Sequence, residues 1–161
     1  GLIEPAAGTI TVDGDPLPDG GVMPVQLVPQ HPELAVNPRW RLRDVLAEAG
    51  SPEPALLERL SLSESWLSRF PHELSGGELQ RVVICRALLT GAPFVVADEI
   101  SAMLDPITQA QLWTVLLEQV KTGRLGVLAI SHDAELLDVV ADRVVAYGTR
   151  QETSVLEPAL A

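Results

Sequence analysis

Three short polar segments of this chain follow apolar runs and could act on a ligand. The sequence LSGGELQR occupies residues 74–81, Asp98 and Glu99 end the run FVVA, and SHD at 131–133 follows the run LGVLAI. Open α/β sheets bind ligands at the carboxyl ends of their strands, so polar residues in these places are candidates for a site. For an acidic pair alone, the start of a solvated loop is the commoner interpretation.

The segment at 75–78 has two interpretations. Ser75 and Glu78 have the spacing of a capping box, in which each side chain satisfies a free backbone N–H at a helix start. Capping does not explain Gly76 and Gly77, which weaken a helix and are useful where the backbone must approach another group. Glycine N–H groups at the positive end of a helix dipole suit a phosphate. The residues alone leave a capped helix and an anion site both open.

Histidine and cysteine residues offer little further chemistry. The adjacent residues 131–133 point apart at a strand end, so they cannot form a hydrolase triad, and His132 alone is more often a structural donor than a catalyst. His31 and His72 lack the spacing of a zinc site. Cys85 is the only cysteine and lies in the apolar run VVIC, which predicts a buried side chain and excludes an internal disulfide.

Alternating strands and helices must position these segments. Strands at 9–12 and 25–28 are expected to form an antiparallel edge, followed by a helical insertion at 41–70. Beyond it the pattern predicts a helix at 78–89, a strand at 94–97, a helix at 106–121, a strand at 125–130, a helix at 134–141 and a strand at 144–147. Apolar strands separated by helices indicate a parallel sheet covered on both faces.

Composition narrows the class of protein. A length of 161 residues with 47% hydrophobic residues indicates one domain with an ample core. The net charge of −11 argues against nucleic acid as a partner, because phosphate binding requires clustered Lys and Arg. No apolar run approaches the ~18 residues of a transmembrane segment, so a soluble intracellular domain is expected.

Taken in order, the motifs resemble those of the ATP-binding subunit of an ABC transporter. Residues 74–81 resemble the signature segment, the strand ending at Asp98 and Glu99 resembles Walker B, and the loop SAMLD resembles the D-loop. His132 matches the switch histidine, and Gln30, after LVP, matches the Q-loop. The runs ELAVNPR and FPHEL are similar to those of oligopeptide, dipeptide and nickel importers.

This resemblance implies ATP and Mg²⁺ as cofactors and a role for each residue near the strand ends. Asp98 would hold Mg²⁺, and Gln30 would meet Mg²⁺ or the attacking water. Glu99 would be the catalytic base that orients the water, and His132 would contact the γ-phosphate. Ile100 departs from the family, which most often has proline there.

The resemblance also implies a site shared between two subunits. Ser75, Gly76, Gly77 and Glu78 would contact the γ-phosphate of a nucleotide held by the opposite subunit. Asp105 would add a cross-subunit contact from the D-loop. Its local interpretation is an N-cap, because a proline follows it.

One motif of the family is missing from these residues. The only lysine, Lys121, follows Val120, so no G-x-x-x-x-G-K-[ST] loop can be written. We expect an N-terminally truncated member without the Walker A loop, strand and helix, and inactive alone. The implied fold is α/β and P-loop NTPase-like, with a parallel sheet, an antiparallel edge and a helical subdomain. Residues 1–30 and 88–161 would form a partial ATPase core, and 31–87 the helical signature subdomain.

The implied function is ATP binding and hydrolysis coupled to uptake of peptides or nickel complexes. Its partners would be a second ABC ATPase subunit, identical or different, and transmembrane permease subunits, at the inner face of the cell membrane in the cytoplasm. One alternative is a non-hydrolytic interaction module that completes a partner's ATP site. Another is a DNA-repair or chromosome-maintenance ATPase, which the lack of a coiled-coil insertion and of a basic patch disfavours.

Overall fold

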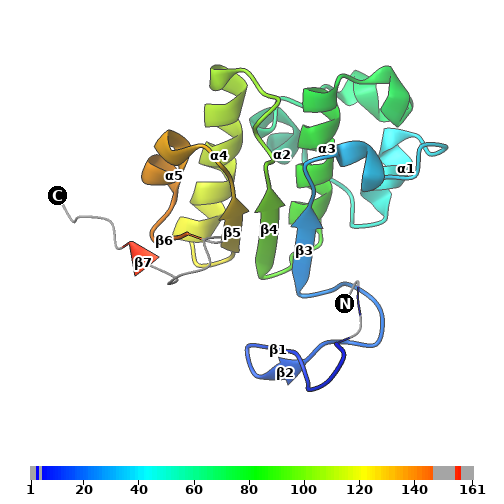
Figure 1. The fold of residues 1–161 in the computed structure, drawn as a ribbon. Helices are drawn as coiled ribbons and strands as arrows, with labels where there is room; N and C mark the ends of the chain where they lie inside the picture. Colours follow the sequence, from blue (N-terminus) through cyan, green and yellow to red (C-terminus); the bar gives the residue numbers. More distant parts are fainter. Residues whose placement is uncertain (1–2, 4, 147–154, 157–161) are drawn as a thin grey trace.

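A three-stranded parallel sheet forms the centre of the molecule (Figure 1), and the computed structural model describes residues 3, 5–146 and 155–156. The strands, in spatial order, are β3 (Val25–Val28), β4 (Phe94–Asp98) and β5 (Gly126–Ile130). Val28 pairs with Ala97, and Asp98 pairs with Ile130. The carboxyl ends of all three strands therefore lie along one edge, as a parallel sheet requires.

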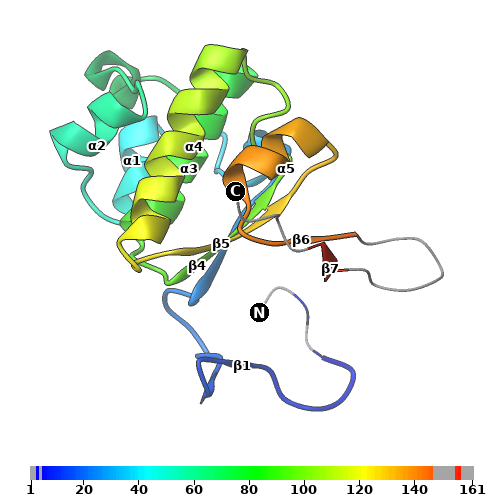
Figure 2. The same cartoon turned by 90° about the vertical axis from the view of Figure 1, so that its left-hand side faces the viewer.

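The two long helices lie on the same side of this sheet (Figure 2). They are α3 (Gly76–Leu89), which follows β3, and α4 (Pro106–Lys121), which joins β4 to β5. On the other face Leu27, Leu128 and Ile130 are 46%, 61% and 48% exposed. The prediction of a sheet covered on both faces is thus wrong for the described residues. Because the strands follow one another in one direction, right-handed crossovers place both connecting helices on one face.

The predicted helical insertion is present as three short helices, α1 (Leu42–Ala47), α2 (Pro54–Arg59) and η2 (Glu64–Ser68), flanked by η1 (Pro32–Leu34) and η3 (Pro71–Glu73). Among these elements η1 and α1 contact α3, and η2 contacts α1. Leu42 and Leu46 of α1 are fully buried, as is Cys85 of α3. Burial raises the pKa of the Cys85 thiol to about 12, so this side chain is a core residue, as its apolar neighbours predicted.

The predicted antiparallel edge is wrong in its pairing. β1 (Thr11–Val12) pairs with β2 (Asp15–Pro16), whereas β3 belongs to the parallel sheet. The cause is the turn between β1 and β2, where Asp13 and Gly14 both have positive φ, 55° and 90°. Two such residues form the tight turn that folds a strand straight back on the next few residues.

The end of the described chain also differs from the expected sheet. After α5 (Ala134–Val140), β6 (Val144–Val145) pairs antiparallel with β7 (Val155–Leu156) instead of extending the parallel sheet. Tyr147, the last residue of the expected strand, lies outside the described residues. None of the described helices combines the length and apolar character needed to span a bilayer.

Candidate functional site

The structure gathers three of the predicted segments at the edge where the parallel strands end. Gln30 comes two residues after β3, Asp98 is the last residue of β4, and His132 comes two residues after β5. The backbone N–H of Glu99 donates to Ile130 O at 3.0 Å, which extends the pairing of β4 and β5 by one residue. Adjacent strands thus carry these polar groups to the place where α/β sheets bind ligands.

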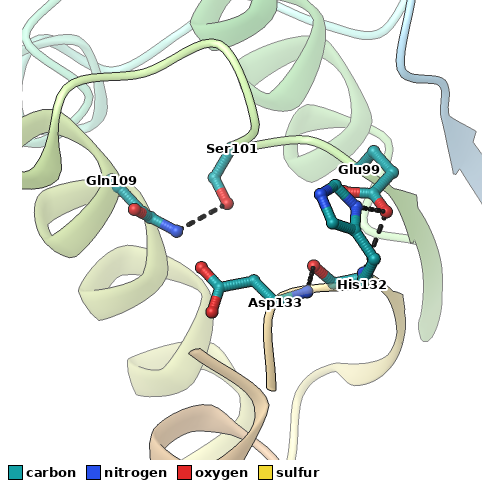
Figure 3. Close-up of polar contacts among 6 residues, drawn as sticks. Glu99, Ser101, Gln109, His132 and Asp133 are labelled. Atoms are coloured by element: carbon teal, nitrogen blue, oxygen red, sulfur yellow. Dashed lines mark hydrogen bonds and ion pairs between the residues drawn. The ribbon is translucent and has the colours of Figure 1, made fainter. Parts of the chain in front are cut away.

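Glu99 and His132 contact each other directly, a contact that the sequence pattern did not reveal. Glu99 Oε1 accepts a hydrogen bond from the His132 backbone N–H at 3.0 Å and lies 2.6 Å from Nδ1 of the same residue (Figure 3). The Glu99 side chain is 16% exposed and that of His132 is 83% exposed. Glu99 has a φ of 49°, in the left-handed region that non-glycine residues rarely adopt. Such backbone strain clusters at functional sites.

The contact gives a prediction about pH. The hydrogen bond and charge of Glu99 raise the pKa of His132. Because this pKa is higher in the folded than in the unfolded chain, the contact stabilises the fold fully below the unfolded value and ceases to do so as pH rises through the folded value. We expect the pKa of His132, measured by NMR titration of its ring protons, to fall towards the ordinary value in Glu99→Gln. An unchanged pKa would show that the two side chains do not interact in solution.

Asp98 and Gln30 are the residues to test as ligands of a cation. Within the described part of the chain the Asp98 carboxylate has no hydrogen-bond or ion-pair partner, and the exposed Gln30 side chain has none either. The described part of the chain contains no cluster of three or more His, Cys, Asp or Glu residues that could hold a metal ion. Mg²⁺ usually keeps several waters and binds through one or two carboxylates together with substrate phosphates. These oxygen donors therefore fit Mg²⁺ that arrives with a nucleotide.

A second group of predicted residues lines an open pocket of about 470 Å³ at the start of α3. One side of the pocket consists of residues 75–78 and Arg81, and the other of residues 103–105 and Thr108. The structure thus brings the glycine-rich segment together with Asp105, although 27 residues separate Asp105 from Glu78 in the chain. The pocket lies at the start of a 14-residue helix, the kind of position where backbone N–H groups favour anions.

The capping box is present in the structure and sets where α3 begins. Ser75 Oγ accepts from the Glu78 backbone N–H at 3.3 Å, and the Ser75 N–H donates to Glu78 Oε2 at 2.7 Å. The hydrogen bond from the Ser75 backbone lowers the pKa of Glu78. Since Ser75 is the N-cap, the helix starts at Gly76, two residues before the expected start.

Packing against Leu104 explains why residue 77 is a glycine, which the sequence alone did not reveal. A Cβ atom at Gly77 would lie 2.8 Å from Leu104 Cδ2, so any other residue there would push Leu104 aside. A Cβ atom at Gly76 would meet only Met103 Sδ at 3.7 Å, an ordinary contact. Gly77 therefore allows α3 to approach the loop that ends at Asp105, while Gly76 leaves its N–H surface open.

Asp105 is the N-cap of α4. Its Oδ1 accepts from the backbone N–H groups of Ile107 and Thr108, both at 3.1 Å, and its Oδ2 accepts from Thr108 Oγ1 at 2.6 Å. These bonds lower the pKa of Asp105, with the Thr108 hydroxyl as the largest cause. The local interpretation of Asp105 is therefore realised, and the cross-subunit contact stays a prediction.

Comparison with known proteins gives a family and several relatives. The family model described as ABC transporter matches residues 1–102. The chain is 33% identical over 133 residues to the oligopeptide transport ATP-binding protein OppF of Bacillus subtilis (strain 168), covering 74% of this chain and 44% of OppF. It is 32% identical over 158 residues to the nickel import system ATP-binding protein NikE of Staphylococcus aureus (strain MSSA476), covering 90% of this chain and 64% of NikE. The chain thus spans less than half of OppF and less than two thirds of NikE.

Solved structures share the fold. A dimeric ATP-binding cassette in a post-hydrolysis state, bound to ADP and Pi, superposes with a TM-score of 0.74 at 22% identity, covering 89% of this chain and 70% of that one. The ATP binding subunit of an ABC transporter superposes with a TM-score of 0.72 at 28% identity, covering 90% of this chain and 65% of that one. The α/β fold that the motifs implied is therefore confirmed.

Proposed function

This chain belongs to the ABC transporter family, and from that premise we propose that it forms part of an ATP-hydrolysing subunit of an importer for peptides or nickel complexes. The observation that supports the hydrolytic role is the contact of the strained, mostly buried Glu99 with His132, next to an Asp98 carboxylate that has no partner among the described residues. The two cargo classes are those in the names of OppF and NikE.

Each of the residues at the strand ends would have a separate role in ATP hydrolysis. MgATP supplies the γ-phosphoryl group that is transferred to water. Asp98 and Gln30 would hold the ion through oxygen atoms. Among the described contacts Glu99 uses only Oε1 for His132, so its Oε2 is free to take the proton of the attacking water. His132, mostly exposed, would donate to a phosphate oxygen from Nε2 while Nδ1 stays on Glu99.

The pocket at the start of α3 would complete the ATP site of a second ATPase subunit. Ser75, Gly76 and Gly77 would present their N–H groups to its γ-phosphate, with Asp105 at the rim of the pocket. Permease subunits in the membrane would be the further partners, and the protein would then lie at the inner face of the cell membrane. The proposal also divides the chain into a partial ATPase core, residues 1–30 and 88–161, and a helical subdomain, residues 31–87.

We expect the 161 residues alone to bind ATP weakly and to hydrolyse it no faster than background. They contain no G-x-x-x-x-G-K-[ST] segment, so the β- and γ-phosphates would lack the N–H groups and the lysine that hold and stabilise them. Calorimetry and a phosphate-release assay at millimolar MgATP test this, with circular dichroism to show that the chain is folded. Saturable turnover that disappears in Glu99→Gln would contradict the expectation.

A non-hydrolytic module is a second candidate function, because residues 75–78 line the pocket at α3 while the phosphate loop is missing from these residues. The two functions differ in what Glu99 does. The test measures ATP hydrolysis by the complete gene product paired with its partner subunit. If the protein is a non-hydrolytic module, Glu99→Gln should leave the hydrolysis rate of the pair unchanged. A hydrolytic subunit would lose its own share of the turnover.

A further inference from the structure

Two polar side chains are buried in the described structure, and each is next to a candidate site residue. Gln80 and Ser101 are both 5% exposed. Gln80 Nε2 donates to the carbonyl oxygen of Pro29, directly before Gln30, at 3.2 Å. Ser101 lies two residues after Glu99. Buried polar groups are costly unless they are hydrogen-bonded, so the partners of each deserve an explanation.

The Ser101 hydroxyl accepts two hydrogen bonds from α4. Gln109 Nε2 donates to Ser101 Oγ at 3.2 Å (Figure 3), and Trp113 Nε1 donates to the same oxygen at 3.1 Å. Trp113 is itself only 5% exposed, so its indole N–H is shielded from bulk solvent and depends on this acceptor. We name these three residues, Ser101, Gln109 and Trp113, the Ser101 clamp.

The clamp holds the middle of the loop that joins the two parts of the site. In this loop the Ala102 N–H donates to Glu99 O at 3.2 Å, and the Leu104 N–H donates to Ser101 O at 3.0 Å. The loop therefore makes two overlapping turns, and Ser101 belongs to both. Its first end carries the strained Glu99, and its last residues line the pocket where Leu104 packs against Gly77.

We propose that Ser101 is a positioning residue, whose clamped hydroxyl fixes the path of the 99–105 loop and so aligns Glu99 with the pocket at the start of α3. This inference rests on the proposed hydrolytic function. Any shift of Ser101 moves Glu99 at one end of the loop and Leu104 at the other. Through Leu104 and Gly77 the clamp links Glu99, the catalytic base of this subunit's own ATP site, to the pocket at the start of α3, which would complete the ATP site of the second subunit.

A purely structural role makes a different prediction. If the hydroxyl only satisfied two buried donors, its removal would lower the melting temperature, and the folded variant would hydrolyse ATP at the parent rate. A positioning role requires a lower kcat well below the melting temperature, with the affinity for MgATP unchanged. Displacement of a catalytic group by about 1 Å can cost roughly 10²-fold in rate.

The experiment compares Ser101→Ala with Ser101→Thr in the complete gene product and its partner subunit. Ser101→Ala leaves both donors of α4 without an acceptor, whereas threonine keeps the hydroxyl. We expect kcat to fall by about tenfold or more in Ser101→Ala and to stay within about threefold of the parent in Ser101→Thr. Trp113→Phe keeps the ring but removes one donor, so it tests the same clamp if Ser101→Ala fails to fold. Parent-like kcat in a folded Ser101→Ala, or in Trp113→Phe when the first does not fold, would overturn the proposal.

Hydrogen exchange separates this proposal from the proposed function. Amide exchange at Ala102 and Leu104 should become faster in Ser101→Ala and return to the parent rate in Ser101→Thr, whether or not ATP is hydrolysed. If the parent shows no turnover, the proposed hydrolytic function fails and the exchange rates alone decide. Unchanged exchange at both amides would then overturn the clamp, and faster exchange would support it.

Discussion

Glu99→Gln is expected to lower ATP hydrolysis by about 10²- to 10⁴-fold in the complete gene product while MgATP binding stays intact. Glutamine keeps the size of the side chain, and its carbonyl oxygen can still accept the bond from the His132 N–H that now spans 3.0 Å. It cannot take a proton from water. Phosphate release under single-turnover conditions measures the chemical step, and calorimetry measures binding.

Glu58→Gln is the matched control for this substitution. Glu58 is exposed on α2 and has no side-chain partner among the described contacts, so the same change of charge there should leave turnover at the parent rate. Near-normal turnover in Glu99→Gln would show that Glu99 is only a loop carboxylate. Its Oε2 atom would then not act as the base that takes a proton from the attacking water.

Gly76→Asp is expected to abolish ATP-dependent pairing of the subunits, with the melting temperature close to that of the parent. The substitution puts a negative charge where the proposal places the partner's γ-phosphate, and an acidic residue in the first turn of a helix is compatible with the helix dipole. Gly76 is the better position for this test because a side chain at Gly77 would have to displace the Leu104 side chain. Light scattering of protein that carries Glu99→Gln to block hydrolysis measures the pairing.

Gly76→Ala separates charge from bulk. A methyl group at this position meets only the sulfur of Met103, a side chain that is 68% exposed, so it should be accommodated. We expect Gly76→Ala to pair nearly as well as the parent. Pairing that survives Gly76→Asp unchanged would reduce the segment to a capped helix start, which the hydrogen bonds of Ser75 and Glu78 already explain.

Local signals in the sequence predicted much of the fold. The helix expected at 106–121 is α4, because an aspartate and a proline begin it and an apolar stripe runs along it. Strands expected at 94–97 and 125–130 are β4 and β5, each within one residue at its ends. Such elements are determined by neighbours in the chain, and capping and periodicity reveal those neighbours.

Features that depend on distant residues were not predictable in the same way. The contact of Glu99 with His132 spans 33 residues, and the packing of Leu104 on Gly77 spans 27. Neither has a local signature. The pairing of β1 and β2 does have one, because Asp13 and Gly14 form a turn that favours pairing with the residues immediately after it. The single covered face of the sheet followed from the order of the strands in space, which alternation along the chain does not reveal.

The uncovered face of the sheet has a practical consequence for producing this polypeptide alone. Leu27, Leu128 and Ile130 form an apolar surface, and in the described residues the outer strands β3 and β5 each pair on one side only. Exposed apolar strands with free edges are templates for association between chains. Recombinant expression is therefore expected to favour inclusion bodies, and co-expression with a polypeptide that covers this face is the rational route to monodisperse samples.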